Sequence, residues 1–180
     1  MTFRSLFPGL VLLVMSAMAG SNPASAQDTL IVVFGTVKDL TSNEPLTDFQ
    51  VEAMDLKWGR RVLATVSPEG RYELDLLQEG DFMIEYGAPG HAHKRVRVDM
   101  HGPTVEEWLG GYGMNVDVRL FREVEGLDLS LGGEPFGICR YDSVADIFSW
   151  DLAYTESMRE RMKGVLAEYE KRFPPPSTAR

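Results

Sequence analysis

Residues 62–86 read VLATVSPEGRYELDLLQEGDFMIEY. Apolar and polar residues alternate in three short runs, and groups of turn-forming residues separate the runs. In the first turn, Pro68 fixes φ near the value that the opening turn position needs, and Gly70 accepts a positive φ. Alternation with a period of two is typical of strands that bury one face. This stretch therefore predicts three strands joined by two tight turns.

The same alternation extends over residues 30–121 and predicts seven short strands. They are centred on residues 31–37, 49–53, 62–66, 72–76, 82–86, 96–100 and 116–120. Two sheets that each have one apolar face remove both faces from water by packing against one another. We expect a mainly β fold, a seven-stranded transthyretin-like or Ig-like β-sandwich. A closed barrel would give the same sequence pattern.

Composition limits the class of protein. The 180 residues carry 18 Lys and Arg against 27 Asp and Glu, a formal net charge of −9. An acidic chain without a basic stripe argues against a nucleic-acid partner, because that affinity depends largely on the neutralisation of phosphates. The one cysteine, Cys139, has no partner for an internal disulfide. We expect it to be a buried thiol that packs as a small apolar group, with a reactive thiol as the alternative.

The first 26 residues have the pattern of a secretory signal peptide. Arg4 supplies the positive n-region, an apolar stretch follows, and Ala24-Ser25-Ala26 forms a small-residue cleavage pattern before Gln27. The apolar stretch is shorter than the roughly 20 residues that a bilayer span needs. We therefore predict export to the periplasm or the medium, cleavage near Ala26-Gln27, and no membrane span in the mature chain.

The pattern changes after residue 123. We expect the sandwich to occupy residues 27–123, an appendage to occupy 124–173, and a disordered tail to occupy 174–180. One or two short strands fit within residues 138–150. From Leu152 the apolar spacing becomes helical, with Asp151 or Thr155 as the N-cap. The apolar stripe of this helix comprises Tyr154, Met158, Met162, Val165, Leu166 and Tyr169. Docking of this stripe on the sandwich and docking on a partner protein are the two alternatives.

Several of these features resemble the carboxypeptidase regulatory-like domain. They are Gly35-x-Val37, the turn at residues 41–46, the strand at Val51, the hairpin at residues 68–72, and the run from Ala88-Pro89-Gly90-His91 to Asp99. The resemblance covers about residues 30–121 and implies a transthyretin-like sandwich. It also implies a non-catalytic accessory role, which is the usual role of the module. Residues 127–172 resemble an uncharacterised tail found in exported proteins.

The loop that contains Trp108 and Tyr112 is the main candidate binding site. These two aromatic residues flank Leu109-Gly110-Gly111, and on a flexible loop they can stack on a sugar ring or clamp a peptide. A hydrophobic plug over the end of the sandwich is the alternative interpretation.

Two weaker candidates are metal sites, and both have simpler explanations. His91 and His93 would project from one face of a strand and start a metal site with Asp99, but nearby Lys and Arg residues repel a cation. Asp39, Asn43 and Glu44 offer oxygen ligands for calcium, but hydrogen bonding within an Asx-turn explains them. We predict neither a metal nor a cofactor.

No nucleophile in the sequence has a recognisable relay. The Gly-x-Ser-x-Gly elbow and the phosphate-binding Gly-Lys-Ser/Thr motif are both missing from the sequence. The leading hypothesis is therefore an exported, non-enzymatic binding or assembly module of the bacterial envelope, with an envelope protein as its partner. Carbohydrate or small-ligand binding through Trp108 and Tyr112 is the second hypothesis, and a cryptic hydrolase is the third.

Overall fold

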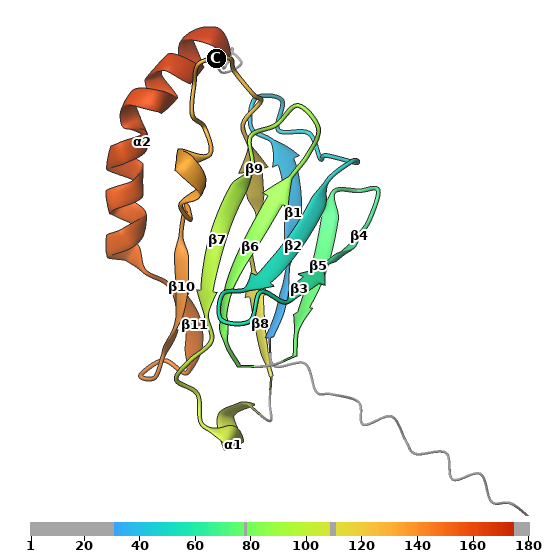
Figure 1. Ribbon diagram of the computed structural model, residues 1–180, viewed down its shortest axis with the longest axis vertical. Coiled ribbons are helices and arrows are strands. Elements are labelled where there is room, and N and C mark those ends of the chain that lie inside the picture. Colours follow the sequence, from blue (N-terminus) through green and yellow to red (C-terminus); the bar gives the residue numbers. More distant parts are fainter. Residues whose placement is uncertain (1–30, 78, 109–110, 175–180) are drawn as a thin grey trace, which may run out of the picture.

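Figure 1 shows a computed structural model of the chain, in which residues 31–77, 79–108 and 111–174 are described. The predicted signal segment and residues 175–180 of the predicted tail lie outside these ranges. Two β-sheets face one another, and one long helix lies beside them. The prediction of a mainly β sandwich with a C-terminal helix is confirmed, and the barrel alternative is wrong.

The first sheet is built around the longest strand, β1. It contains β4 (Thr65–Val66), β5 (Arg71–Leu76), β1 (Ile31–Asp39) and β8 (Tyr112–Asn115) in this order, and β9 (Val118–Leu120) also pairs with β1. β1 is antiparallel to β5 and parallel to both β8 and β9. In this register Val33 lies opposite Leu74 and Met114, and all three are buried.

The second sheet forms the other layer. It contains β11 (Ile147–Trp150), β10 (Ile138–Asp142), β7 (Lys94–Asp99), β6 (Asp81–Gly87), β2 (Gln50–Asp55) and β3 (Arg61–Leu63) in this order. Ala53, Ile84 and Val96 lie side by side across β2, β6 and β7. Their side chains are buried against the first sheet, as the period-two alternation predicts.

The first part of the chain forms more strands than expected, because one of the seven predicted runs is divided and β8 forms outside all of them. Residues 62–66 give β3 in one sheet and β4 in the other, and the chain changes sheet at Ala64, whose amide donates to Val51. Val66 consequently lies 47% exposed instead of facing inward. The run at residues 116–120 is reduced to β9, and β8 forms before it.

The region beyond residue 123 is continuous with the sandwich. β10 pairs in parallel with β7, and β11 pairs with β10, so this hairpin extends the second sheet. The appendage predicted for residues 124–173 thus contributes two strands to the second sheet. A short 3-10 helix, η1 (Leu131–Gly133), precedes β10, and the four-residue α1 (Val105–Trp108) lies at one end of the sandwich.

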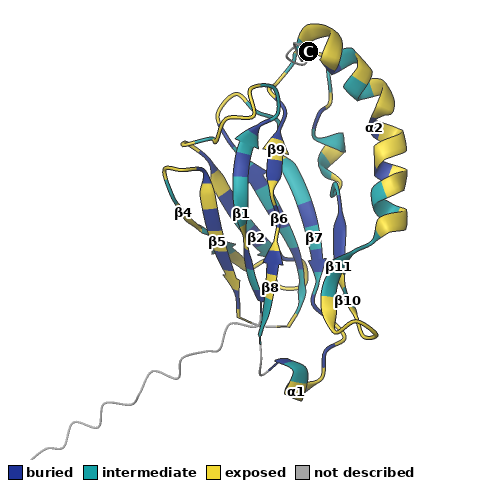
Figure 2. Cartoon of the chain, turned by 180° about the vertical axis from the view of Figure 1, so that it is seen from behind, coloured by how far each residue is buried: buried dark blue, intermediate teal, exposed yellow. Residues whose placement is uncertain are grey.

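The C-terminal helix α2 (Leu152–Arg172) docks on its own chain. Asp151 is the N-cap and accepts a hydrogen bond from the Tyr154 amide, so the Asp151 alternative is confirmed. Met158, Met162 and Tyr169 of the predicted stripe are buried. Figure 2 shows that the opposite side of α2 is exposed. Among the helices in the described ranges, none is long and apolar enough to span a membrane.

Candidate functional site

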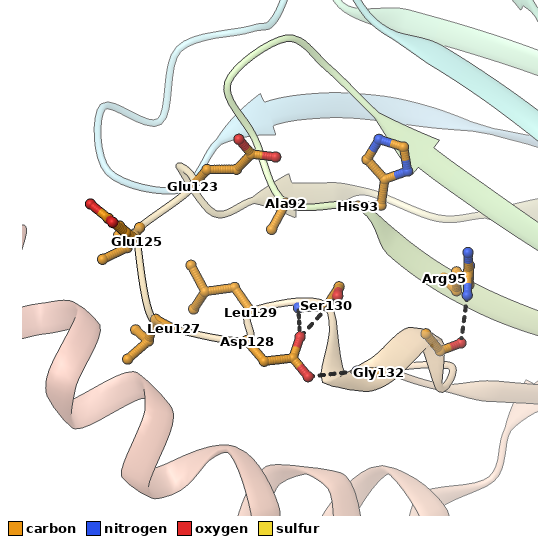
Figure 3. A pocket seen from close by; sticks show the side chains of 12 residues that line it. Ala92, His93, Arg95, Glu123, Glu125, Leu127, Asp128, Leu129, Ser130 and Gly132 are labelled. Carbon is orange, nitrogen blue, oxygen red and sulfur yellow. Dashed lines mark hydrogen bonds between the residues drawn. The ribbon is translucent and has the colours of Figure 1, made fainter.

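One hollow near charged residues lies between the start of β7 and the segment that follows β9. It has a volume of about 690 Å³. Figure 3 shows Glu123, Ala92 and His93 along one side and Leu127, Asp128, Leu129 and Ser130 along the other, with Arg95 at one end.

A second hollow adjoins the first and has a volume of about 670 Å³. His93 and Glu123 line both hollows, so the two adjoin, and together they are here called the polar groove. Its second half is lined by Asp48, Phe49, Gln50, Glu52, Glu85, residues 87–90 and His91. The volume of each half is within the roughly 300–1,000 Å³ of most ligand sites.

Backbone pairing fixes the two sides of the groove. The Pro89-Gly90 turn, in which Gly90 has a φ of 70°, reverses the chain after β6. The Ala92 amide then donates to the Phe121 carbonyl oxygen, and the Glu123 amide donates to Gly90. These bonds hold the loop after β6 against the end of β9, and they explain why His93 and Glu123 lie in both hollows.

The far side of the groove is a compact turn organised by Asp128. Its carboxylate accepts hydrogen bonds from the Ser130 hydroxyl at 2.9 Å, the Ser130 amide at 3.1 Å and the Gly132 amide at 2.8 Å. These donors, the Ser130 hydroxyl above all, hold the pKa of Asp128 below its usual range. The Asp128 carboxylate thus stabilises the turn, and its oxygens already accept hydrogen bonds from Ser130 and Gly132.

The cations of the groove are neutralised within the protein. Glu85 accepts hydrogen bonds from Arg95 Nε at 2.5 Å and from His93 Nδ1 at 3.0 Å. Burial would raise the pKa of Glu85, but Arg95 and His93 outweigh it and lower the pKa. Arg95 also donates to the Gly133 carbonyl oxygen.

Three other carboxylates of the groove differ from Asp128 and Glu85, because their side chains have no hydrogen-bond partner within the described ranges. Within the described ranges, no hydrogen bond or ion pair involves the side chains of Asp48, Glu123 or Glu125, which line the groove. Because the basic side chains of the groove are paired with Glu85 or Asp39, the unpaired charge in the groove is negative. A groove with this charge favours a cationic ligand.

A buried ion cluster adjoins the groove through His91. The Asp39 side chain is nearly inaccessible, and its Oδ2 accepts from Arg122 Nε at 2.7 Å and from His91 Nε2 at 3.0 Å. Its Oδ1 accepts from the Thr41 and Ser42 amides. Burial raises the pKa of Asp39, but Arg122, Ser42 and His91 outweigh it and hold the pKa well below its usual range.

The structure places Trp108 and Tyr112 together, but not as an exposed binding platform. Trp108 is only 9% exposed, and its ring lies 5.4 Å from that of Tyr112 and 5.8 Å from that of Phe148. The Tyr112 hydroxyl donates to Asp146 Oδ1 at 2.7 Å. The β10–β11 hairpin supplies aromatic partners that cover most of Trp108. Residues 109–110 of the loop lie outside the described ranges, and ligand binding through Trp108 and Tyr112 stays a prediction. The pair closes one end of the sandwich, as the plug interpretation holds.

His91 and His93 do not share a site. β7 begins only at Lys94, so neither histidine lies in a strand. His91 contacts Asp39 and the Pro89 carbonyl oxygen, whereas His93 contacts Glu85. Across the ranges that the structure describes, no group of three His, Cys, Asp or Glu side chains is arranged to hold a metal.

The remaining expectations concern Asp39, its turn and Cys139. Asp39 caps the turn through the Thr41 and Ser42 amides, which is the predicted Asx-turn, and Asn43 has a φ of 60°. Cys139 is buried, as expected, and burial raises the pKa of its thiol to about 12. A thiol with this pKa is a poor nucleophile at neutral pH.

Sequence reasoning missed Arg122, Glu123 and Glu125. The usable signal was the group of acidic residues directly after the last predicted strand, since loops at strand ends often carry binding residues. The partner of Arg122 was not predictable, because Asp39 lies 83 residues away in the chain.

No family model matches the chain, and no curated protein matches it either. The chain is 15% identical to catechol 1,2-dioxygenase from Acinetobacter sp. ADP1 over 61% of this chain and 57% of that one, with a TM-score of 0.39. It is 13% identical to the pilus 2b backbone protein of group B streptococcus over 54% and 42%, with a TM-score of 0.38. The chain thus spans about half the length of these proteins. Similarities of this size identify neither a family nor an activity.

Proposed function

We propose that this protein is an exported, non-enzymatic binding module of the bacterial envelope, and that its polar groove holds a cationic segment of a partner protein. The observation that carries the proposal is the pair of adjoining hollows with three unpaired carboxylates on their walls. A long open groove suits an extended segment of chain, and the negative charge selects a basic one.

The two histidines of the groove are already hydrogen-bonded within the protein, which supports a binding role over catalysis. Both ring nitrogens of His91 contact groups of the protein itself, Asp39 and the Pro89 carbonyl oxygen, so the ring is held in place by contacts within the chain. His93 Nδ1 is bonded to Glu85. A carboxypeptidase regulatory-like module with an accessory role is consistent with this arrangement and remains part of the proposal.

Export is proposed from the sequence of residues 1–26 alone. The test is the mass of the protein recovered from the envelope fraction of the producing cell. Cleavage after Ala26 predicts a chain that begins at Gln27. Recovery of the chain from the cytosol with residues 1–26 intact would contradict export and would leave the groove proposal standing.

The groove is tested with synthetic peptides. Fluorescence anisotropy should show binding of a short extended peptide rich in Lys and Arg and no binding of a Glu-rich peptide of equal length. The double variant Glu123→Gln/Glu125→Gln should weaken binding by roughly three- to tenfold, since each partly exposed ion pair contributes up to about 1 kcal/mol. Added salt should weaken binding of the wild-type protein.

The matched control is Glu170→Gln. Glu170 lies on the exposed side of α2 and has no ion pair in the described structure. The proposal fails if Glu170→Gln weakens the peptide as much as the double variant does, because the attraction would then come from overall charge. It also fails if the two peptides bind equally.

A further inference from the structure

Lys94 is a basic residue in an unusual place. Lys94 begins β7. Because alternate residues of a strand share one face, it lies on the same face as Val96 and Val98, whose side chains are buried in the sandwich core. Its ammonium group lies 4.8 Å from the ring centre of Phe136 and 5.7 Å from that of Phe121. Its hydrogen bond is a long one, 3.4 Å to the Arg119 carbonyl oxygen. The amine thus lies beside two aromatic rings at the partly exposed margin of the sandwich.

Among the residues that the structure describes, none supplies a counter-ion to Lys94. Within the described ranges no carboxylate forms an ion pair with Lys94, whereas buried charges in proteins are normally paired. The charged and titratable groups around it are Arg119 on β9, Arg159 on α2, which pairs with Glu156, and Tyr86 across the strand pair. Burial first, and then the charge of Arg119, lower the pKa of Lys94 to about 8.

A small cavity lies at the same position, between the sandwich and α2. It has a volume of about 230 Å³ and is lined by Lys94, Phe121, Phe136, Thr155, Met158, Arg159, Met162 and Leu166. Five of these eight residues are apolar, and Arg159 stands at the exposed margin. The cavity is smaller than the roughly 300–1,000 Å³ of sites for drug-sized ligands.

We propose that this cavity binds an alkyl monocarboxylate of medium chain length, with its carboxylate against Lys94 and its chain between Phe136, Met158 and Met162. The carboxylate supplies the missing counter-ion. The alkyl chain fills an apolar space that would hold water poorly, and the apolar walls disfavour a small hydrated anion. This site is separate from the polar groove and does not depend on the function proposed for it.

The test uses the methionine methyl groups as reporters. In the wild-type protein with ¹³C-labelled methionine methyl groups, octanoate should shift the NMR signals of Met158 and Met162. Met54 and Met83 line a different hollow, on the face of the second sheet that points away from the first sheet. Their signals should not shift. Octylamine, which has the same chain and the opposite charge, should bind at least tenfold more weakly than octanoate.

Substitution of Lys94 separates charge from packing. Lys94→Met keeps the length of the side chain and removes its charge, and it should weaken octanoate at least tenfold, whereas the exposed control Lys163→Met should have no effect. Because a carboxylate beside the amine favours its protonated form, octanoate affinity in the wild-type protein should fall as the pH rises above about 8.

Three results would overturn the proposal. One is equal binding of octanoate and octylamine, and another is unchanged octanoate binding in Lys94→Met. The third is the absence of Met158 and Met162 shifts at octanoate concentrations up to about 10 mM, tenfold above a dissociation constant of 1 mM. If Lys94→Met does not fold, the comparison of octanoate with octylamine on the wild-type protein decides the question alone.

Discussion

At the scale of single residues, the buried carboxylate of Asp39 connects distant parts of the chain. It joins the turn after β1 to His91 beyond β6 and to Arg122 beyond β9. Tyr169 of α2 reaches the same area, because its hydroxyl contacts Thr41 Oγ1 at 3.0 Å and accepts from the Arg122 amide at 3.2 Å. The base of the polar groove and the docked helix therefore share one hydrogen-bond network.

Asp39→Asn should lower the free energy of unfolding at pH 7 by about 1–3 kcal/mol, because an amide cannot accept every bond that the carboxylate accepts. The folded pKa of Asp39 lies below its unfolded value. Its contribution is therefore complete above about pH 4, near the unfolded pKa, and falls as the pH drops below that value. Urea unfolding at pH 7, 4 and 3 should show a difference between wild type and variant that shrinks in acid. An equal cost for the exposed Asp75→Asn would contradict this account.

The two core tyrosines allow a second prediction at this scale. The Tyr72 hydroxyl donates to the Val116 carbonyl oxygen at 2.8 Å and lies 2.9 Å from the Tyr86 hydroxyl, so Tyr86 is the donor to Tyr72. Tyr72→Phe leaves both neighbours without a partner, whereas Tyr86→Phe removes a donor and leaves the bond to Val116 intact. We expect Tyr72→Phe to cost about 1–3 kcal/mol and Tyr86→Phe about 1 kcal/mol. Chemical denaturation measures both, and the reverse order would refute the assigned donors.

At the scale of the elements, Gly35 explains how one strand pairs with two. β1 pairs with β8 through residues 31–34 and with β9 through residues 37–39. Gly35 lies at the break between them, where the Val116 carbonyl oxygen occupies the place that a Cβ would need.

Gly35→Ala should therefore destabilise the protein by roughly 1–3 kcal/mol, the usual cost of overpacking. Gly113→Ala on the neighbouring strand is the matched control, because a Cβ there meets Phe34 at an ordinary 3.5 Å. Thermal unfolding should show a clearly lower midpoint for Gly35→Ala and a nearly unchanged midpoint for Gly113→Ala. Similar midpoints for the two variants would show that the break in pairing can move at little cost.

Helix α2 gives the other prediction at this scale. Met162 is buried with Phe121, Leu129 and Tyr169 in a cluster between α2 and the sandwich. Met162→Ala should cost about 2–5 kcal/mol, whereas Glu170→Ala on the exposed side should change stability by less than about 0.5 kcal/mol. Urea unfolding followed by circular dichroism measures both. A cost below 1 kcal/mol for Met162→Ala would mean that the helix does not depend on this contact.

The elements also show how far the sequence alone could lead. The period-two alternation predicted core residues correctly: Val51, Leu74, Ile84 and Val118 are all buried. Alternation could not show that residues 62–66 change sheet, because a strand has the same period in either layer. The β10–β11 hairpin was placed outside the sandwich, since its pairing with β7 joins residues about 40 positions apart and leaves no local signal. The plug interpretation anticipated the covered position of Trp108, but its aromatic partner on the hairpin, Phe148, had no local signal.

At the scale of the whole molecule, the sandwich, the added hairpin and the docked helix meet around the polar groove. One wall follows β6 and leads into β7, and the other follows β9 and leads to β10. The net charge of −9 over the whole chain adds to the local charge of Glu123 and Glu125 and favours encounter with cationic partners. Overall charge alone would attract cationic partners to any face of the protein. The place where the peptide binds therefore distinguishes a specific groove from general electrostatic attraction.

The most direct measurement is therefore a map of amide NMR shifts during titration with the Lys- and Arg-rich peptide. Binding in the polar groove predicts shifts confined to residues 48–52, 85–95 and 123–133, with none on the outer face of the first sheet around Phe34, Thr36 and Glu73. Shifts spread over both sheets, or centred on the first, would contradict the proposed role of the groove.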